Sequence, residues 1–355
     1  MSTIRNVALC GGTHGNERTG VTVVQRRQAP LYAGPGDPGT LPTARVPETF
    51  SLTTLISNPE AVAHNRRYID FDLNRSFGNA VLQSPHSSGY EAQRAQVLNR
   101  MLGPKGSTDP ACDLLIDMHT TTARLGPTIL IRENDGVASF IAAAVMVELP
   151  EVKVMSYLAE ERGKTVAPPG APSASNIDRP GTAASVDIGS SAVPAAGGAP
   201  GAADRPGDYP YLAEIAPHGI EIEVGPVPQG VIRAETVIWT ERIVNSCIAA
   251  IDAWNGGRTL DLPETIEVYR YIQAVDYPRN TAGEINGFVH PARQDRDFAA
   301  LRRGDPLFLH FDGSTVSYDG PDGRYPVFIN EAAYYEKHAG MTLCEKRTIP
   351  VGAVS

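Results

Sequence analysis

The sequence predicts an α/β protein with a mostly parallel sheet, followed by a smaller and mainly β domain. Over the first 256 residues, short apolar segments alternate with segments of helical periodicity, which is typical of right-handed β-α-β crossovers. After Asn255-Gly-Gly257 the chain holds only short β-rich pieces separated by Asp-Gly and Gly-Asp turns. We therefore expect one domain at residues 1–256 and a second at residues 257–355.

The elements of the first domain follow from apolar runs, periodicity and turn residues taken in chain order. The expected strands cover residues 4–10, 50–56, a run from 112 that ends at His119, 128–132 and 152–157. The expected helices cover residues 20–28, 90–101, 137–147 and 234–254. Residues 29–47 are rich in Pro and Gly and predict a loop. Residues 164–206 hold mainly Ala, Pro, Gly and Ser, so they cannot build a core and predict a long mobile insertion near the site.

Bulk composition excludes several classes of partner. The chain has 355 residues, 42% of them hydrophobic and 20% charged, which is ordinary for a globular protein long enough for two domains. A net charge of −9 argues against a nucleic-acid partner. No apolar run approaches the roughly 20 residues that span a bilayer, so we expect no membrane partner and a cytoplasmic protein. The four cysteines are far apart in sequence and are expected to be reduced core residues.

The end of the first strand presents two potential metal ligands. Gly11 and Gly12 let the backbone turn, and His14 and Glu17 follow three residues apart, so an imidazole and a carboxylate can reach one divalent ion. On its own, this spacing also fits a surface turn that happens to carry both residues.

A second strand with a similar ending supplies the missing ligand. The apolar run that starts at Cys112 stops at His119, and strand ends are where function gathers in parallel sheets. Three protein ligands and an open position are expected of catalytic zinc, whereas structural zinc is closed by four. Asp117, two residues earlier, is placed to steady a ligand ring.

Two further segments carry groups that suit hydrolytic chemistry. Arg75 and Asn74 suit a substrate carboxylate, and Arg67 suits an oxyanion, although a solvated loop whose arginines pair with nearby aspartates is the alternative. In a later segment, Glu221 and Glu223 alternate with Ile220, Ile222 and Val224 and share one face of a strand. One of them is expected to act as general base, and a solvent-facing pair on an edge strand is the alternative.

The predicted second domain contains four short strands and a tyrosine pair. The expected strands cover residues 267–274, 287–290, 306–311 and 315–318. Tyr334 and Tyr335 follow them, and their side chains are expected in the core, at an edge, or over the cleft of the first domain.

Seven ordered motifs resemble the aspartoacylase family, also called the aminoacylase-2 family. The motifs are Gly-Gly-Thr-His14-Gly-Asn-Glu17, Arg67-Tyr-Ile-Asp, Asp72-Leu-Asn74-Arg75, Asp117-Met-His119, Glu223-Val-Gly-Pro with Pro-Gln-Gly230, Val275-Asp-Tyr-Pro-Arg279 and Asn330-Glu-Ala-Ala-Tyr-Tyr-Glu-Lys337. The resemblance covers nearly the whole chain outside residues 164–206. It implies a zinc-carboxypeptidase-like α/β/α domain with a C-terminal β domain, and hydrolysis of an N-acyl, most simply N-acetyl, amino acid.

The resemblance also assigns roles to individual residues. It implies one Zn²⁺ per chain held by His14, Glu17 and His119, with Glu223 activating water and Arg67 polarising the scissile carbonyl. It assigns the α-carboxylate to Asn74, Arg75 and Tyr334, makes Tyr209 a further substrate residue, and implies a homodimer acting on a small molecule. The choice of Glu223 over Glu221 rests on the family motif alone.

One departure from the family pattern bears on the substrate. Aspartoacylases have an arginine ten residues before the catalytic glutamate, where this chain has Ala213. A buried substrate carboxylate without that guanidinium would lack its partner, so an aromatic, apolar or S-substituted cysteine side chain is expected instead of aspartate. Arg162, Arg179 or Arg205 from the insertion would be substitutes in a true aspartoacylase. A biosynthetic or carboxypeptidase-like zinc hydrolase would also fit these motifs, as would a non-catalytic metal-dependent binding protein.

Overall fold

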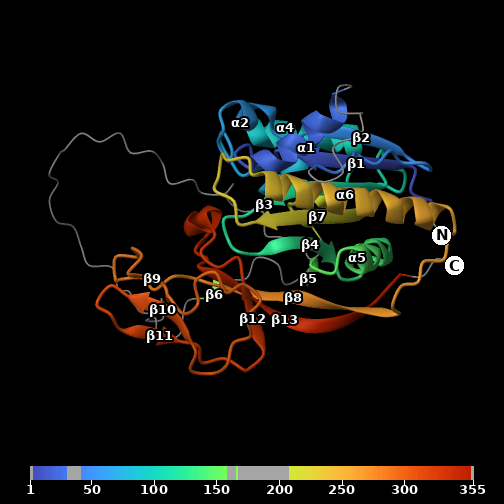
Figure 1. The fold of residues 1–355 in the computed structure, drawn as a ribbon. Coiled ribbons are helices and arrows are strands. Elements are labelled where there is room, and N and C mark those ends of the chain that lie inside the picture. Colours follow the sequence, from blue (N-terminus) through green and yellow to red (C-terminus); the bar gives the residue numbers. More distant parts are fainter. Residues whose placement is uncertain (1–2, 30–40, 158–164, 167–207, 353–355) are drawn as a thin grey trace.

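The computed structural model describes residues 3–29, 41–157, 165–166 and 208–352. The insertion predicted at residues 164–206 therefore lies almost entirely outside the described residues, as do Arg162, Arg179 and Arg205. One large sheet runs through the molecule with helices on both of its faces, and a small sheet lies beside one end of it (Figure 1).

The strands and helices predicted for the first domain are present, with ends that differ by up to two residues. The strands are β1 Asn6–Gly11, β2 Ser51–Ile56, β3 Leu114–Thr120, β4 Gly126–Arg132, β5 Lys153–Tyr157 and β7 His218–Gly225. The helices are α1 Arg18–Gln28, α2 Pro59–Ala63, α3 Asn79–Leu82, α4 Tyr90–Leu102, α5 Gly136–Glu148 and α6 Ala234–Asn255. Two 3-10 turns, η2 Leu73–Arg75 and η3 Leu212–Glu214, lie near the site.

The main sheet is mixed, with the order β12-β13-β8-β5-β4-β7-β3-β1-β2 and β6 (Thr165–Val166) paired to β8. The neighbouring pairs β2–β1, β1–β3 and β3–β7 are parallel, and so are the β4–β5 and β5–β8 pairs. The β4–β7 pair is antiparallel, because the short connection after β3 reverses the chain instead of making a crossover. The prediction of a mostly parallel sheet therefore holds for the first domain except at this one pair.

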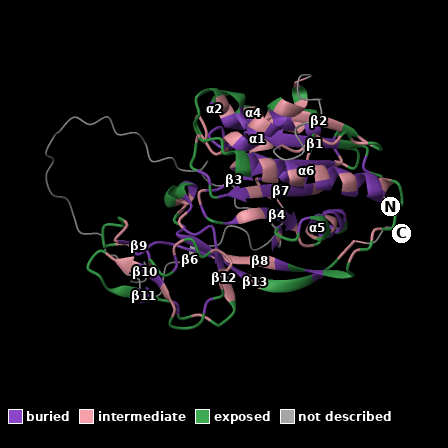
Figure 2. Cartoon of the chain, in the orientation of Figure 1, coloured by how far each residue is buried: buried purple, intermediate pink, exposed green. Residues whose placement is uncertain are grey.

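The central strands of the sheet are buried on both faces, which gives the three-layer architecture. Along β1, Val7 and Leu9 pack into the core under α1, α5 and α6, while Ala8 and Cys10 pack into a second core with α4 and η3. This period of two is what a strand covered on both faces requires. Figure 2 shows the buried interior of the sheet between its two helical layers. The predicted α/β/α layering is confirmed.

The second part of the chain continues the main sheet and adds a small one. β8 Thr265–Val275, β12 Arg324–Val327 and β13 Met341–Pro350 extend the main sheet. β9 Gly287–Val289, β10 Pro306–His310 and β11 Thr315–Ser317 form the small sheet, and η4 Ala332–Lys337 precedes β13. β12 and β13 were not among the predicted strands. The main sheet thus runs past residue 256.

The four cysteines are free and buried, as predicted. Among the helices that the structure describes, none is long and apolar enough to cross a membrane.

Candidate active site

Three predicted metal ligands meet at the carboxyl ends of β1 and β3. His14 and Glu17 follow β1, where Gly12 adopts a φ of +69° and lets the chain turn into α1. His119 lies at the end of β3, which pairs with β1. One ligand atom from each residue lies within 4.8 Å of the others, and all three residues are buried.

The hydrogen-bond geometry of this cluster suits a divalent cation. Nδ1 of His14 lies 2.7 Å from Glu17 Oε1, and Nδ1 of His119 lies 3.0 Å from Glu17 Oε2. The opposite nitrogens face other carboxylates: His14 Nε2 lies 3.0 Å from Asp72 Oδ1, and His119 Nε2 lies 2.8 Å from Asp117 Oδ2. An Nε2–H donated to each aspartate leaves the Nδ1 lone pair beside Glu17. Two nitrogens and a carboxylate fit Zn²⁺.

Electrostatics and packing hold this set in place. Burial opposes ionisation of Glu17, but the positive charges of His14 and His119, when their rings are protonated, hold its pKa well below the usual range. Thr13 Oγ1 donates to Asp117 Oδ1 at 2.7 Å, which fixes the carboxylate that faces His119. The predicted contact between Asp117 and a ligand ring is therefore present.

Glu223 lies next to the cluster on a central strand. β7 runs between β3 and β4, and His119 and Glu223 are register partners on adjacent strands. Glu221 and Glu223 both line a small cavity with the ligands, so the alternative of a solvent-facing pair on an edge strand is wrong. Within the described part of the chain, Glu223 Oε2 is buried without a hydrogen-bond partner. Burial raises the pKa of Glu223 well above the usual range against the opposing effect of His119, and the carboxylates of Glu17 and Glu331 add to the rise.

The loop between α2 and η2 brings the predicted cationic groups to the same place. Arg67 donates to Glu17 Oε1 and to Asp72 Oδ2, each at 3.2 Å. The guanidinium of Arg75 lies 4.7 Å from the ring centre of Tyr211. Asn74 is buried, and its side-chain oxygen accepts a hydrogen bond from Leu212 N at 2.8 Å. Arg67 does pair with an aspartate, as the loop alternative supposed, but it also reaches a metal ligand.

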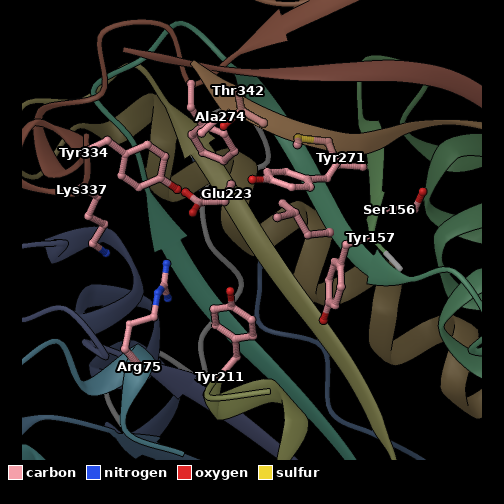
Figure 3. A pocket seen from close by; sticks show the side chains of 13 residues that line it. Arg75, Ser156, Tyr157, Tyr211, Glu223, Tyr271, Ala274, Tyr334, Lys337 and Thr342 are labelled. Carbon is pink, nitrogen blue, oxygen red and sulfur yellow. The ribbon is translucent and has the colours of Figure 1, made fainter. Parts of the chain in front are cut away.

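The second domain contributes Tyr334 and Lys337 from η4. Tyr334 lines both site cavities, whereas Tyr335 is 44% exposed and stacks on Tyr277. In Figure 3 the hydroxyl of Tyr334 points toward Glu223, and Lys337 extends toward the Arg75 guanidinium. Lys337 Nζ donates to Asp72 Oδ2 at 2.6 Å. Of the three placements expected for the tyrosine pair, Tyr334 takes the one over the cleft.

Glu331 connects η4 to the strand that carries His119. Its buried carboxylate accepts hydrogen bonds from Thr122 N at 2.7 Å, Thr122 Oγ1 at 3.0 Å and Ala123 N at 3.3 Å, and from Thr121 Oγ1. A buried carboxylate with this many donors is a strong link between chain segments that are more than 200 residues apart.

Two connected cavities differ sharply in character. The small one, of about 30 Å³, is lined by the metal ligands, Arg67, Asn74, Arg75 and the glutamates. The larger one, of about 270 Å³, lies beside it and shares Arg75, Glu223, Phe328 and Tyr334 with it. It is lined mainly by uncharged side chains, which are Leu130, Met155, Ser156, Tyr157, Tyr211, Tyr271, Ala274, Phe328 and Thr342 (Figure 3). Its cationic lining groups, within the described part of the chain, are Arg75 and Lys337.

Not every predicted residue lies in these cavities. Tyr209 is outside the lining of both, and Tyr211, two residues later, lines the larger one instead. Ala213 is 2% exposed and packs in the core. Tyr211 and Lys337 had no predicted role, and Asp72 was expected only as a partner of the arginines in the loop alternative. Asp72 and Lys337 lie inside quoted motifs, and Tyr211 lies two residues from Tyr209, so proximity to a motif was the available signal.

Comparison with known proteins gives consistent matches over nearly the whole chain. Residues 3–251 match the succinylglutamate desuccinylase/aspartoacylase catalytic domain, and residues 264–346 match the AstE/AspA barrel-sandwich hybrid domain. An N-acyl-aromatic-L-amino acid amidohydrolase (carboxylate-forming) of Danio rerio is 36% identical, over 100% of this chain and 93% of that protein. The aspartoacylase of Xenopus tropicalis is 33% identical, over 100% of this chain and 96% of that protein. The crystal structure of murine aminoacylase 3 superposes with a TM-score of 0.76 at 33% identity, covering 99% of this chain and 98% of that one.

Proposed function

The chain belongs to the succinylglutamate desuccinylase/aspartoacylase family, and from this premise we propose that it is a zinc-dependent amidohydrolase of N-acyl L-amino acids. The products are a carboxylate and a free amino acid. The observation that carries the proposal is the cluster of His14, Glu17 and His119 beside Glu223, in a cavity that also holds guanidinium groups.

Five polar residues of the small cavity have parts at the reacting bond. His14, Glu17 and His119 would hold Zn²⁺, which would act as a Lewis acid and make water a nucleophile near neutral pH. Glu223 takes a proton from the attacking water and delivers it to the leaving nitrogen as the C–N bond breaks. Arg67 donates to the carbonyl oxygen as negative charge develops there. Burial would lower the pKa of Arg67, but the carboxylates of Asp72 and Glu17 raise it further. Arg67 therefore stays cationic during the reaction.

The amino-acid part of the substrate is held at the junction of the two cavities. Arg75, Asn74 and Tyr334 are assigned to the α-carboxylate, since a guanidinium, an amide and a hydroxyl can all donate to it. The position of Lys337 beside Arg75 supports this assignment by adding a fourth donor. We propose acetyl as the acyl group, in line with the small size of the cavity beside the proposed metal ligands.

The larger cavity favours an uncharged amino-acid side chain. Leu130, Met155 and Phe328 offer apolar contacts, and the described cations of its lining are both assigned to the α-carboxylate end. We therefore propose aromatic, apolar or S-substituted cysteine derivatives as substrates, in line with the packing of Ala213 into the core. The second candidate is a true aspartoacylase, which relatives bearing that name favour and which would need an arginine from outside the described residues.

The test is amine release by zinc-loaded protein from N-acetyl derivatives of aspartate, phenylalanine, tyrosine, methionine and S-benzylcysteine, with a chelator-treated control. Turnover of the uncharged derivatives without aspartate is the expected result. Preference for aspartate would replace the proposed substrate class with the second candidate. Equal activity in the chelated control would overturn zinc dependence.

Several sequence predictions stay predictions. They are the role of Tyr209, the domain boundary at residues 256 and 257, the homodimer and the cytoplasmic location.

A further inference from the structure

A buried carboxylate outside both cavities holds the loop that carries the substrate-binding groups. Glu91 lies in the first turn of α4 and is fully buried. Its Oε1 accepts from Ile69 N at 2.6 Å, and its Oε2 accepts from Asp70 N at 2.9 Å and Phe71 N at 3.1 Å. Three consecutive backbone N–H groups thus converge on one side chain.

The other bonds of this loop lie mainly on either side of residues 69–71. Gly15 N donates to Arg67 O at 3.2 Å, and the Arg67 and Asp72 side chains pair with Glu17, His14 and Lys337. Residues 66–72 belong to no helix or strand, and each of them keeps part of its surface exposed. The bonds to Glu91 therefore fix the middle of the loop, between Arg67 on one side and Asn74 and Arg75 on the other.

The start of α4 is shaped to bring this carboxylate against the loop. Gly89, the residue before α4, has a φ of +95°, and a Cβ there would lie 2.5 Å from the ring of Phe71. Asp70 Oδ2 in turn accepts from Tyr90 N at 2.7 Å, which caps the helix. The helix and the loop therefore hold each other, and the N-terminus of α4 favours the negative charge of Glu91.

The same carboxylate also reaches the strand end that carries His14. Asn58 Nδ2 donates to Glu91 Oε1 at 3.1 Å, and Asn58 N donates to Gly12 O at 3.1 Å. Asn58 is itself fully buried. Glu91 therefore sets the loop relative to the metal ligands and not only relative to α4.

From this geometry we infer that Glu91 is a positioning residue for the reaction: it sets Arg67 and Arg75 against the metal cluster without touching substrate. This inference rests on the proposed function for the roles of the two arginines. Glu91→Gln replaces one acceptor oxygen with an NH₂ group that faces backbone N–H donors, so the loop must shift. A misplacement of about 1 Å costs on the order of 100-fold in rate, so we expect kcat/KM to fall about 10- to 100-fold.

Asp252→Asn is a matched control. Asp252 is a fully buried carboxylate on α6 whose Oδ1 accepts from Glu48 N and Thr49 N, both at 2.9 Å, but that segment carries no site residue. Both variants are expected to have a lower Tm, whereas only Glu91→Gln should have a lower kcat/KM. In Glu91→Gln, misplacement of Arg75 should raise KM and misplacement of Arg67 should lower kcat. Bound zinc is measured in each variant, and assays use saturating zinc.

A second readout does not depend on turnover. Hydrogen exchange followed by mass spectrometry should show faster exchange over residues 66–76 in Glu91→Gln and no change there in Asp252→Asn. If Glu91→Gln does not fold, Glu91→Asp serves in its place, since it keeps the charge and loses reach.

The outcomes separate the two proposals. Faster exchange together with lower kcat/KM supports positioning by Glu91. A folded, zinc-loaded variant with kcat/KM within about twofold of wild type, or with unchanged exchange over the loop, would overturn it. Absence of wild-type turnover on every N-acyl amino acid would instead remove the proposed function, and exchange alone would then decide whether Glu91 holds the loop.

Discussion

The two site cavities share a boundary but differ in what they are made of. The small cavity is built from ionisable side chains at strand ends and on one loop, and these groups contact one another directly. The larger cavity is built mainly from apolar and tyrosine side chains of β4, β5, β8 and β13 and their flanking segments. The difference indicates that reaction chemistry and side-chain selection reside in separate groups, so each should change without the other.

The largest expected effect is loss of the base in the small cavity. Glu223→Gln should lower kcat by about 10²- to 10⁴-fold while zinc binding and substrate binding persist, because the amide cannot accept the proton of water. Steady-state kinetics and metal analysis measure both quantities. Glu221→Gln is the matched control, since this second glutamate of β7 lines only the small cavity. If kcat fell less in Glu223→Gln than in Glu221→Gln, Glu221 would be the general base instead of Glu223.

A change confined to the larger cavity should alter selection and leave chemistry intact. Met155→Ala removes apolar contact, so the ratio of kcat/KM for N-acetylphenylalanine to that for N-acetylalanine should fall about tenfold. Bound zinc should be unchanged. Met341→Ala, a truncation of a buried methionine that lines neither cavity, should keep the ratio. If Met155→Ala slowed both substrates equally, the two cavities would not be separable.

The smallest expected effect concerns pH at the boundary between the cavities. Burial and the positive charge of nearby Arg75 lower the pKa of Lys337 to about 7, although the carboxylate of Asp72 acts in the opposite direction. Lys337 is therefore cationic below that pH and neutral above it, so KM for anionic substrates should rise a few-fold between about pH 6 and about pH 8. Lys337→Met should have a high KM at every pH, because it lacks the group whose loss of charge raises KM between about pH 6 and about pH 8. An unaltered pH profile in that variant would exclude Lys337 as its source.

The sequence was sufficient for most of the first domain and for the centre of the site. Apolar runs such as residues 4–10 predict buried strands because their side chains face cores on both sides of the sheet. The three proposed metal ligands could be located because they lie at or just after the ends of such runs. β7 was harder, because alternating Ile and Glu is also the pattern of an edge strand. Its place between β3 and β4 buries Glu221 and leaves Glu223 half-buried, facing the small cavity.

The remaining features depend on contacts that no local pattern records. β13 escaped prediction because Glu345, Lys346 and Arg347 interrupt its apolar residues, although they pair across to β8. Asp72 faces His14 from 58 positions away. Glu91 resembles an ordinary acidic residue in the first turn of a helix until the loop at residues 69–71 is folded onto it.

The shared sheet also limits how this protein could be taken apart or recombined. β5 pairs with β8 through Met155 and Tyr269 and through Ser156 and Arg270, so a fragment ending at residue 256 would bare the edge of β5. An open strand edge invites association with other chains. The same cut would remove Tyr271, Tyr334 and Lys337 from the site. The two family domains are therefore not interchangeable modules, and exchanging the second one between relatives would rebuild the wall of the active site.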